Sequence, residues 1–265
     1  MFRAFVCSTR KEQSMANRAT LPPRGAQTSE FLNVTAAVLA GGLGTRLRSV
    51  IADRPKALAE IKGRPFITYL LDQLTWTGVR SAVLCTGYLG EQIAGAIGEN
   101  WDGLRVSYSR EERPLGTGGA LRLALPHLGS DPVLVLNGDS FCMADLKGFW
   151  NWYHSRPAIV GMLLIQAADT QRYGRVRVES DGAITEFAEK KVDGGPGWIN
   201  AGIYLLNREV ISSIPTETNV SLEHDVFPRL VGRGLCGFPS RGRFLDIGTP
   251  EDFAAAETFF ASLRM

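Results

Sequence analysis

The sequence predicts an α/β fold, with a Rossmann-like, mixed and mostly parallel sheet covered by helices on both faces. Short apolar runs alternate with stretches of helical periodicity through the first half of the chain, an order typical of parallel strands joined by helices. Several of these runs end directly in glycines or polar residues. Because such sheets bind ligands at the carboxyl ends of their strands, we expect these residues to gather at one edge.

The first half of the chain has the clearest pattern. Buried strands are predicted at the apolar runs 35–40, 81–86, 106–109 and 133–137. Apolar residues at helical spacing predict helices at 66–77, 90–97 and 118–125. The first of these helices is expected to stop at Gly78, since glycine commonly ends helices.

The second half mixes strand patterns with turns. Further strands are predicted at 159–165, 198–206 and 244–247. A hairpin is expected between them, with arms at 174–179 and 184–187 joined by the turn Asp181-Gly182. A last helix is expected to start at Thr249 as N-cap, with Pro250 in its first position.

Residues 1–32 differ in composition from the remainder. They mix basic and polar residues with Pro22-Pro23, show no periodic apolar face and lack the apolar core of a secretory signal. We therefore expect a disordered tail, or sequence upstream of a start at Met15. One domain, residues 33–265, is expected to follow.

Composition excludes several classes of protein. With 265 residues, 45% hydrophobic and 21% charged, the chain has a globular composition. A net charge of +2 without a basic stripe argues against nucleic acid as a partner. No apolar run is long enough to span a membrane, so no membrane partner is expected. The chain could act as a homo-oligomer.

The cysteines and histidines are scattered along the sequence. None of the four cysteines forms a C-x-x-C pair, so we expect reduced, mostly buried thiols and a cytoplasmic protein rather than a metal cluster. The three histidines, far apart in sequence, are expected to be surface or structural residues. These residues are Cys7, Cys85, Cys142, Cys236, His127, His154 and His224.

The loop Gly41-Gly42-Leu43-Gly44-Thr45-Arg46 follows the first predicted strand. Its glycines let backbone N–H groups approach phosphate oxygens, and Arg46 adds a cationic fork that matches them. The loop lacks the Lys-Ser or Lys-Thr of the Walker motif and the spacing of the dinucleotide fingerprint. By itself it is equally compatible with a phosphate site and with a tight, glycine-rich turn.

Together with Pro55-Lys56-Ala57-Leu58, this loop resembles the paired N-terminal signature of the sugar-1-phosphate nucleotidyltransferases. The resemblance continues in chain order through five further segments. These segments are Pro114–Leu121, Asn137-Gly138-Asp139, Glu189-Lys190 with Asn200–Tyr204, and Asp246 before Ile247–Pro250. Each segment alone also has a structural explanation, as a turn, a cap or a solvated hairpin end; their joint order favours the family.

The resemblance implies roles for individual residues. Arg46, Lys56 and Asp139 are expected to be catalytic, and Asp139 and Asp246 to hold Mg²⁺ as the cofactor. The sugar phosphate is expected to meet Gly174, Glu189, Lys190 and Asn200. The nucleotide is expected to contact Leu39, Ala40, Gly41, Gly42, Gly44, Thr45, Arg46, Gly116 and Thr117.

The activity implied is direct transfer of a nucleotidyl group from a nucleoside triphosphate to a sugar 1-phosphate, with release of pyrophosphate. Within the family, the similarity is greatest to the short D-glycero-D-manno-heptose 1-phosphate guanylyltransferases, which use GTP and supply surface polysaccharide. Mannose or glucose 1-phosphate with another base is the alternative substrate pair. A GT-A glycosyltransferase would need a D-x-D motif where the chain has Asn137-Gly138-Asp139, and a non-catalytic nucleotide-binding subunit would have lost ligands that are present here.

Overall fold

The structure is a computed structural model that describes residues 31–263 except 43, 48–50, 52, 174 and 189–193. Nearly all of the predicted tail, with Cys7 and Met15, lies outside the described residues. Phe31, at the end of that predicted tail, is buried, and its ring meets Trp150 edge-on with centroids 5.5 Å apart.

Ten strands form the main sheet. Eight follow the order β11-β10-β12-β7-β1-β4-β6-β5, while β9 pairs with β12 and β13 pairs with β9. The bounds are β1 Thr35–Leu39, β4 Ser81–Thr86, β5 Asn100–Trp101, β6 Leu104–Arg110, β7 Val133–Asn137, β9 Val160–Ala167, β10 Arg175–Val178, β11 Ile184–Ala188, β12 Gly197–Leu206 and β13 Leu235–Ser240. Two small sheets pair β2 Glu60–Ile61 with β3 Arg64–Pro65, and β8 Ser140–Cys142 with β14 Phe244–Asp246.

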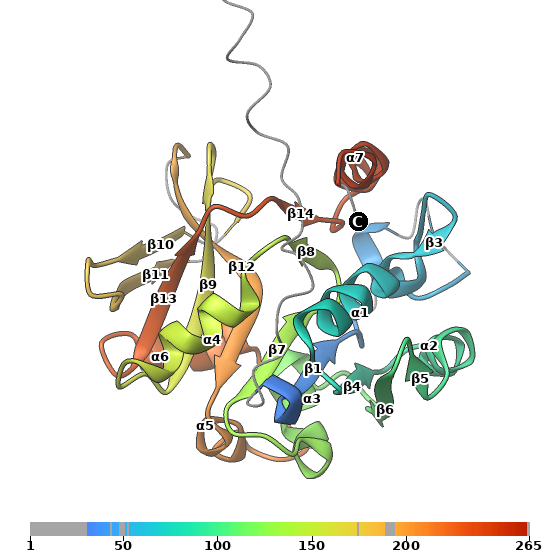
Figure 1. Cartoon of the computed structure of the whole chain (residues 1–265), viewed down its shortest axis with the longest axis horizontal. Coiled ribbons are helices and arrows are strands. Elements are labelled where there is room, and N and C mark those ends of the chain that lie inside the picture. The colour runs from blue at the N-terminus through green and yellow to red at the C-terminus, as the bar shows by residue number, and fades with distance from the viewer. Residues whose placement is uncertain are drawn as a thin grey trace, which may run out of the picture.

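The two halves of the sheet differ in strand direction. In the N-terminal half, β7, β1, β4 and β6 run parallel. In the C-terminal half, β12 is antiparallel to β7, β9 and β10, and only β13 runs parallel to its neighbour β9 (Figure 1). This mixed sheet confirms the predicted α/β class. The predicted strands are present within a few residues of their expected bounds, but β2, β3, β5, β8 and β13 were not predicted.

Seven α-helices are described, of which α1, α2, α3 and α7 were predicted. The bounds are α1 Phe66–Thr77, α2 Gly90–Ile97, α3 Gly116–Ala124, α4 Leu146–His154, α5 Arg208–Ser212, α6 Phe227–Leu230 and α7 Pro250–Ala261. The predicted ends are confirmed: Gly78 adopts a left-handed φ of 97° after α1, and the Thr249 hydroxyl accepts the Asp252 N–H at the start of α7.

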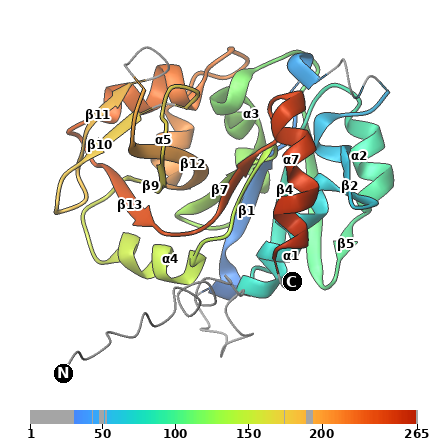
Figure 2. The same ribbon diagram turned by 90° about the horizontal axis from the view of Figure 1, so that it is seen from above.

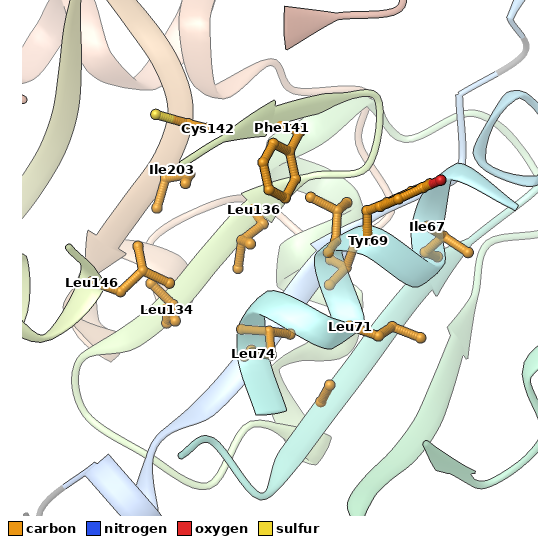
Figure 3. Packing of buried hydrophobic residues seen from close by; sticks show 14 of the residues in the cluster. Ile67, Tyr69, Leu71, Leu74, Leu134, Leu136, Phe141, Cys142, Leu146 and Ile203 are labelled. Atoms are coloured by element: carbon orange, nitrogen blue, oxygen red, sulfur yellow. The ribbon is translucent and has the colours of Figure 1, made fainter. Parts of the chain in front are cut away.

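Helices cover both faces of the sheet. Successive strand residues point to opposite sides, and apolar side chains on both sides need to be buried. On β1, Ala36 and Val38 belong to one buried cluster, while Ala37 belongs to the other. The first cluster contains side chains of α1, α4 and α7, and the second contains side chains of α3, α5 and α6. Figure 3 shows part of the first cluster, where residues of α1, β7 and β8 pack between helix and sheet.

The C-terminal helix α7 packs on the N-terminal half of the molecule. The Phe260 ring stacks on Tyr69 of α1 with centroids 3.9 Å apart, and it meets Phe66 and Phe141 edge-on. Figure 2 shows α7 beside α1. Because β14 directly precedes α7, this packing anchors β14 beside β8.

The described cysteines are free thiols, as expected. Cys85 and Cys142 are buried and Cys236 is partly buried. Burial raises the pKa of the Cys85 thiol to about 12 and also raises the pKa of Cys142, so both stay protonated. Among the described residues, no helix is long and apolar enough to cross a membrane.

Candidate active site

A pocket of about 530 Å³ opens where β1 and β7 end, at the sheet edge that the sequence predicted. Its walls combine the loop after β1, the turn after β7, the residues around the start of α3 and a few residues of the C-terminal half. Most of the predicted nucleotide and catalytic residues line it. These are Leu39, Ala40, Gly41, Gly42, Gly44, Arg46, Lys56, Gly116, Thr117 and Asp139.

The remaining predicted residues are not among those that line the pocket. Asp246 lies next to the pocket, 4.0 Å from the Lys56 ammonium, and Asn200 lies on β12. Thr45 belongs to the 3-10 turn Thr45–Leu47. Gly174, Glu189 and Lys190 lie outside the described residues, so their assignment to the sugar phosphate stays a prediction. The described histidines do not appear among the residues that line the pocket.

The charged centre of the site consists of Lys56, Asp139 and Asp246. The Lys56 Nζ donates to Asp139 Oδ2 at 2.9 Å and lies 4.0 Å from Asp246 Oδ1. The lysine side chain is only 12% exposed, whereas that of Asp139 is 48% exposed toward the pocket. One buried ammonium therefore faces two carboxylates from distant parts of the chain.

The small sheet β8–β14 brings these two aspartates together. Asp139 lies in the turn between β7 and β8, and Asp246 ends β14 opposite Ser140 of β8. The Ile247 N–H donates to the Asp139 carbonyl at 3.0 Å, and the Gly248 N–H donates to Asp246 Oδ1 at 2.6 Å. Backbone pairing thus places both carboxylates independently of a ligand.

Burial raises the pKa of Asp246 above its ordinary value, and the neighbouring Asp139 charge raises it further. Lys56 and the Gly248 N–H act in the opposite direction, but the net shift is upward. The charged form of Asp246 is therefore disfavoured beside the Asp139 carboxylate. Within the described part of the chain, no group of three or more His, Cys, Asp or Glu side chains could hold a metal ion.

Two glycines near Lys56 and Asp139 occupy positions where a larger side chain would not fit without a shift of the neighbouring atoms. A Cβ on Gly138 would lie 2.6 Å from the Leu39 carbonyl oxygen, so the glycine lets the end of β7 approach the end of β1. Gly44 adopts a φ of 58°, and a Cβ there would lie 3.2 Å from Lys56 Cβ. The glycine loop therefore packs directly on the lysine that follows it in the signature.

At the opposite end of the pocket, the start of α3 is held by residues of the C-terminal half. The N–H groups of Gly118 and Gly119 donate to the Val220 carbonyl at 2.8 and 3.2 Å. A Cβ on Gly116 would lie 2.5 Å from that same oxygen. The glycines of the Pro114–Leu121 segment therefore have a structural role, because they allow the backbone at Val220 to pack closely against the start of α3.

Glu223 connects the predicted nucleotide and sugar residues, and the sequence analysis missed it. The carboxylate accepts the Thr117 hydroxyl at 2.8 Å through Oε2 and the Tyr204 hydroxyl at 3.3 Å through Oε1. The Asn200 amide in turn donates to the Tyr204 oxygen at 2.7 Å. Glu223 belongs to a single π-helical turn, Leu222–Val226, for which the sequence carries no recognisable pattern.

Glu111 also lines the pocket without having been predicted. It follows β6 and stands three residues before Pro114, where the sequence analysis placed the start of the motif. A carboxylate directly before a predicted binding loop is a signal that could have identified it.

A profile of the nucleotidyl transferase family matches residues 35–262. The chain is 37% identical over 224 residues to a mannose-1-phosphate guanylyltransferase of Mycobacterium tuberculosis, covering 83% of this chain and 62% of that protein. It is 34% identical over 223 residues to a D-glycero-alpha-D-manno-heptose 1-phosphate guanylyltransferase of Aneurinibacillus thermoaerophilus, covering 84% of this chain and 96% of that protein. The chain thus spans about three fifths of the mycobacterial relative's length.

Solved structures agree with these similarities. HddC from Yersinia pseudotuberculosis superposes with a TM-score of 0.77 at 33% identity, covering 86% of this chain and 99% of HddC. A second structure of HddC, complexed with GMP-PN, has a TM-score of 0.75. The fold and the pocket define a nucleotide-binding enzyme of the α/β class. The chain belongs to the nucleotidyl transferase family.

Proposed function

We propose that the protein transfers a guanylyl group from GTP to D-glycero-D-manno-heptose 1-phosphate and releases pyrophosphate. The Lys56–Asp139–Asp246 centre beside the glycine loop is the observation that carries the reaction class. The choice of GTP and heptose rests on similarity to relatives named as heptose 1-phosphate guanylyltransferases and to HddC, which has been solved with GMP-PN.

The proposed reaction is a direct in-line displacement. A phosphate oxygen of the sugar 1-phosphate attacks the α-phosphorus of GTP, and the bond from that phosphorus to the β-phosphate oxygen breaks. The electron pair of the broken bond leaves with pyrophosphate. Such a transfer asks the protein mainly to position the reactants and to neutralise charge. We assign Arg46 to the β and γ phosphates and Lys56 to phosphate binding, while Lys190 would hold the attacking sugar phosphate.

Magnesium fits the carboxylate pair formed by Asp139 and Asp246. Magnesium prefers oxygen ligands and keeps several waters, so two carboxylates and the substrate phosphates are a sufficient ligand set. Burial and the neighbouring Asp139 charge raise the pKa of Asp246, and a divalent cation bound there would favour the charged carboxylate. When bound, the ion would supply charge neutralisation at the transferring phosphoryl group.

A matrix of nucleoside triphosphates against sugar 1-phosphates, followed by pyrophosphate release, tests this proposal. We expect GTP with heptose 1-phosphate to give the highest kcat/KM, and Asp139→Ala to abolish the signal as the control. Product analysis separates the proposal from a glycosyltransferase, since that class releases no pyrophosphate. Turnover by UTP or dTTP with glucose 1-phosphate would overturn the heptose assignment while keeping the reaction class.

Mannose 1-phosphate is the second candidate acceptor. The identity of 37% to the mycobacterial mannose-1-phosphate guanylyltransferase favours it. The same assay matrix distinguishes the two sugars. Lys190→Ala is expected to raise the KM for either sugar phosphate while leaving the KM for GTP near its original value.

We further propose that the product is a nucleotide sugar for surface polysaccharide and that the enzyme works in the cytoplasm. The free, buried thiols Cys85 and Cys142 agree with a reducing compartment.

A further inference from the structure

A turn formed by residues 169–173 lies between β9 and β10. Asp169 Oδ1 accepts the Gly195 N–H at 3.2 Å, and the Thr170 N–H donates to the Gly195 carbonyl at 3.1 Å. The turn therefore holds the end of the segment that joins β11 to β12, and its own chain continues directly into β10. These are the two stretches that the sequence analysis assigned to the sugar phosphate, through Gly174 and through Glu189-Lys190.

The same turn contacts the chain on both sides of Asp246. Before Asp246, the Phe244 ring at the start of β14 meets the Tyr173 ring edge-on, with centroids 5.7 Å apart. After it, Arg172 binds Asp252 in the first turn of α7, where Nη1 donates to Oδ1 at 3.1 Å and Nη2 donates to Oδ2. Both contact points lie where β14 leads into α7 (Figure 1). The turn thus joins the predicted sugar-phosphate stretches to the element that carries Asp246.

The carboxylate that receives Arg172 is held independently of that arginine. The Thr249 hydroxyl donates to Asp252 Oδ2 at 2.9 Å and accepts the Asp252 N–H at 3.3 Å. The Asp252 side chain is only 18% exposed, and α7 itself is packed against α1 by the stacking of Phe260 on Tyr69. Arg172 therefore binds to a fixed part of the molecule.

The geometry of this ion pair suits orientation better than stability. The Arg172 side chain is 53% exposed, and exposed ion pairs add little to the free energy of folding. A guanidinium that binds both oxygens of one carboxylate, however, fixes direction as well as distance. The main consequence of the pair is therefore the position in which it holds the turn.

We propose that Arg172 is a positioning residue for the sugar 1-phosphate: its paired hydrogen bonds to Asp252 hold the 169–173 turn, with the sugar-phosphate stretches on either side, against the β14–α7 element. This inference rests on the proposed transfer to a sugar 1-phosphate and adds a residue that acts through Asp252 rather than on the substrate. The glycine loop and the start of α3, which line the nucleotide pocket, do not contain this turn. GTP binding should therefore be independent of Arg172.

Steady-state kinetics of Arg172→Ala test the proposal, with pyrophosphate release as the signal and the sugar 1-phosphate that the wild-type enzyme uses best as acceptor. We expect KM for the sugar 1-phosphate to rise ~3- to 10-fold, within the range of coupling between contacting residues. The kcat and the KM for GTP should stay near their wild-type values, the pattern of lost acceptor binding. Arg172→Lys keeps the charge but cannot bind both oxygens, so it should retain most of the increase.

A double-mutant cycle with Asp252→Asn shows whether Arg172 acts through Asp252. The asparagine keeps an oxygen for the Thr249 hydroxyl but loses the charge that pairs with Arg172. We expect this variant to raise the same KM, and the double variant to be no worse than Arg172→Ala alone. Arg177→Ala is the matched control, because it removes an exposed ion pair to Glu186 at 3.4 Å within the β10–β11 hairpin and should leave both KM values unchanged.

Melting temperatures separate positioning from loss of structure. Removal of an exposed ion pair should change the melting temperature of each single variant by less than about 4 °C. The proposal is overturned if Arg172→Ala leaves KM for the sugar 1-phosphate unchanged or raises KM for GTP equally. It is also overturned if Asp252→Asn leaves the sugar KM unchanged or lowers it, because Arg172 would then bind the phosphate directly.

These results differ from failure of the proposed function. In that case the wild-type enzyme itself would release no pyrophosphate with any sugar 1-phosphate. If only the positioning role fails, the wild-type enzyme remains an active sugar-1-phosphate nucleotidyltransferase.

Discussion

The two halves of the sheet contribute to the pocket in different ways. In the N-terminal half, the parallel strands β1, β4, β6 and β7 run in the same direction, so the glycine loop after β1 and Asp139 after the adjacent β7 meet at one edge. The C-terminal half reaches the same pocket by long-range packing, through Gly248 after β14, Asn219 and the π-helical turn that contains Glu223. The side of the pocket built by the N-terminal half can therefore be recognised from short sequence motifs, whereas the other side depends on contacts between segments far apart in the sequence.

Removing Asp139 should have the largest effect, because it deletes the carboxylate that the N-terminal half contributes. We expect Asp139→Ala to lower kcat by about 10²- to 10³-fold, the range seen when a single preorganised charge-stabilising group is lost. Pyrophosphate release with saturating GTP measures the effect. Near wild-type turnover would show that the N-terminal half does not supply the charge centre in the way proposed.

Truncating Phe260 tests whether the packing of α7 on α1 and β8 stabilises the contact between the two halves of the molecule. The side chain is 2% exposed and contacts rings of α1 and β8, so Phe260→Ala should destabilise the fold by about 3–5 kcal/mol. Urea unfolding gives the free energy. Leu123→Ala, at an exposed leucine of α3, is the control and should change stability by less than about 0.5 kcal/mol. Equal effects of the two variants would contradict the docking role of α7.

Gly138→Ala tests the close contact at the ends of β7 and β1. The added Cβ would meet backbone atoms that cannot rotate away, so we expect a loss of about 1–3 kcal/mol of stability. Gly42→Ala is the matched control, since a Cβ there meets nothing within 4 Å and its stability change should stay below about 0.5 kcal/mol. A stable Gly138→Ala protein would mean that the two strand ends can separate freely.

Asp246→Asn should stabilise the magnesium-free protein at neutral pH while lowering its activity. The raised pKa means that the native state disfavours the charged carboxylate, so this group's contribution to stability is greatest below the unfolded pKa and is lost as pH rises through the native pKa. Melting temperatures of both proteins without Mg²⁺ should therefore differ at pH 7 and converge as the solution is acidified. A less stable variant at pH 7 would show that the contacts to Lys56 and Gly248 outweigh the burial of the charge.

Several elements of the fold were predictable from local sequence. Helix ends at Gly78 and Thr249 follow from local capping chemistry, and the strand β7 follows from an uninterrupted apolar run. Helix α4 was not predicted: its Asp145 cap is clear in the structure, accepting the Gly148 N–H at 2.9 Å, but Lys147 and Gly148 weaken the helical pattern. Strand β13 was missed because Gly237 and Pro239 are poor strand residues, and it is held in the sheet by long-range pairing with β9.

The sequence by itself determined the alternation of strands and helices, the glycine loop, the lysine behind it and the family to which these motifs pointed. Only the tertiary structure placed Asp246 opposite Ser140 and set Glu223 between Thr117 and Tyr204. It also placed Glu111 in the pocket wall beside Gly41 and Gly87. The physical reason is range: propensities, caps and loop motifs act over a few residues, whereas these contacts join segments brought together only by burial of the cores on both faces of the sheet.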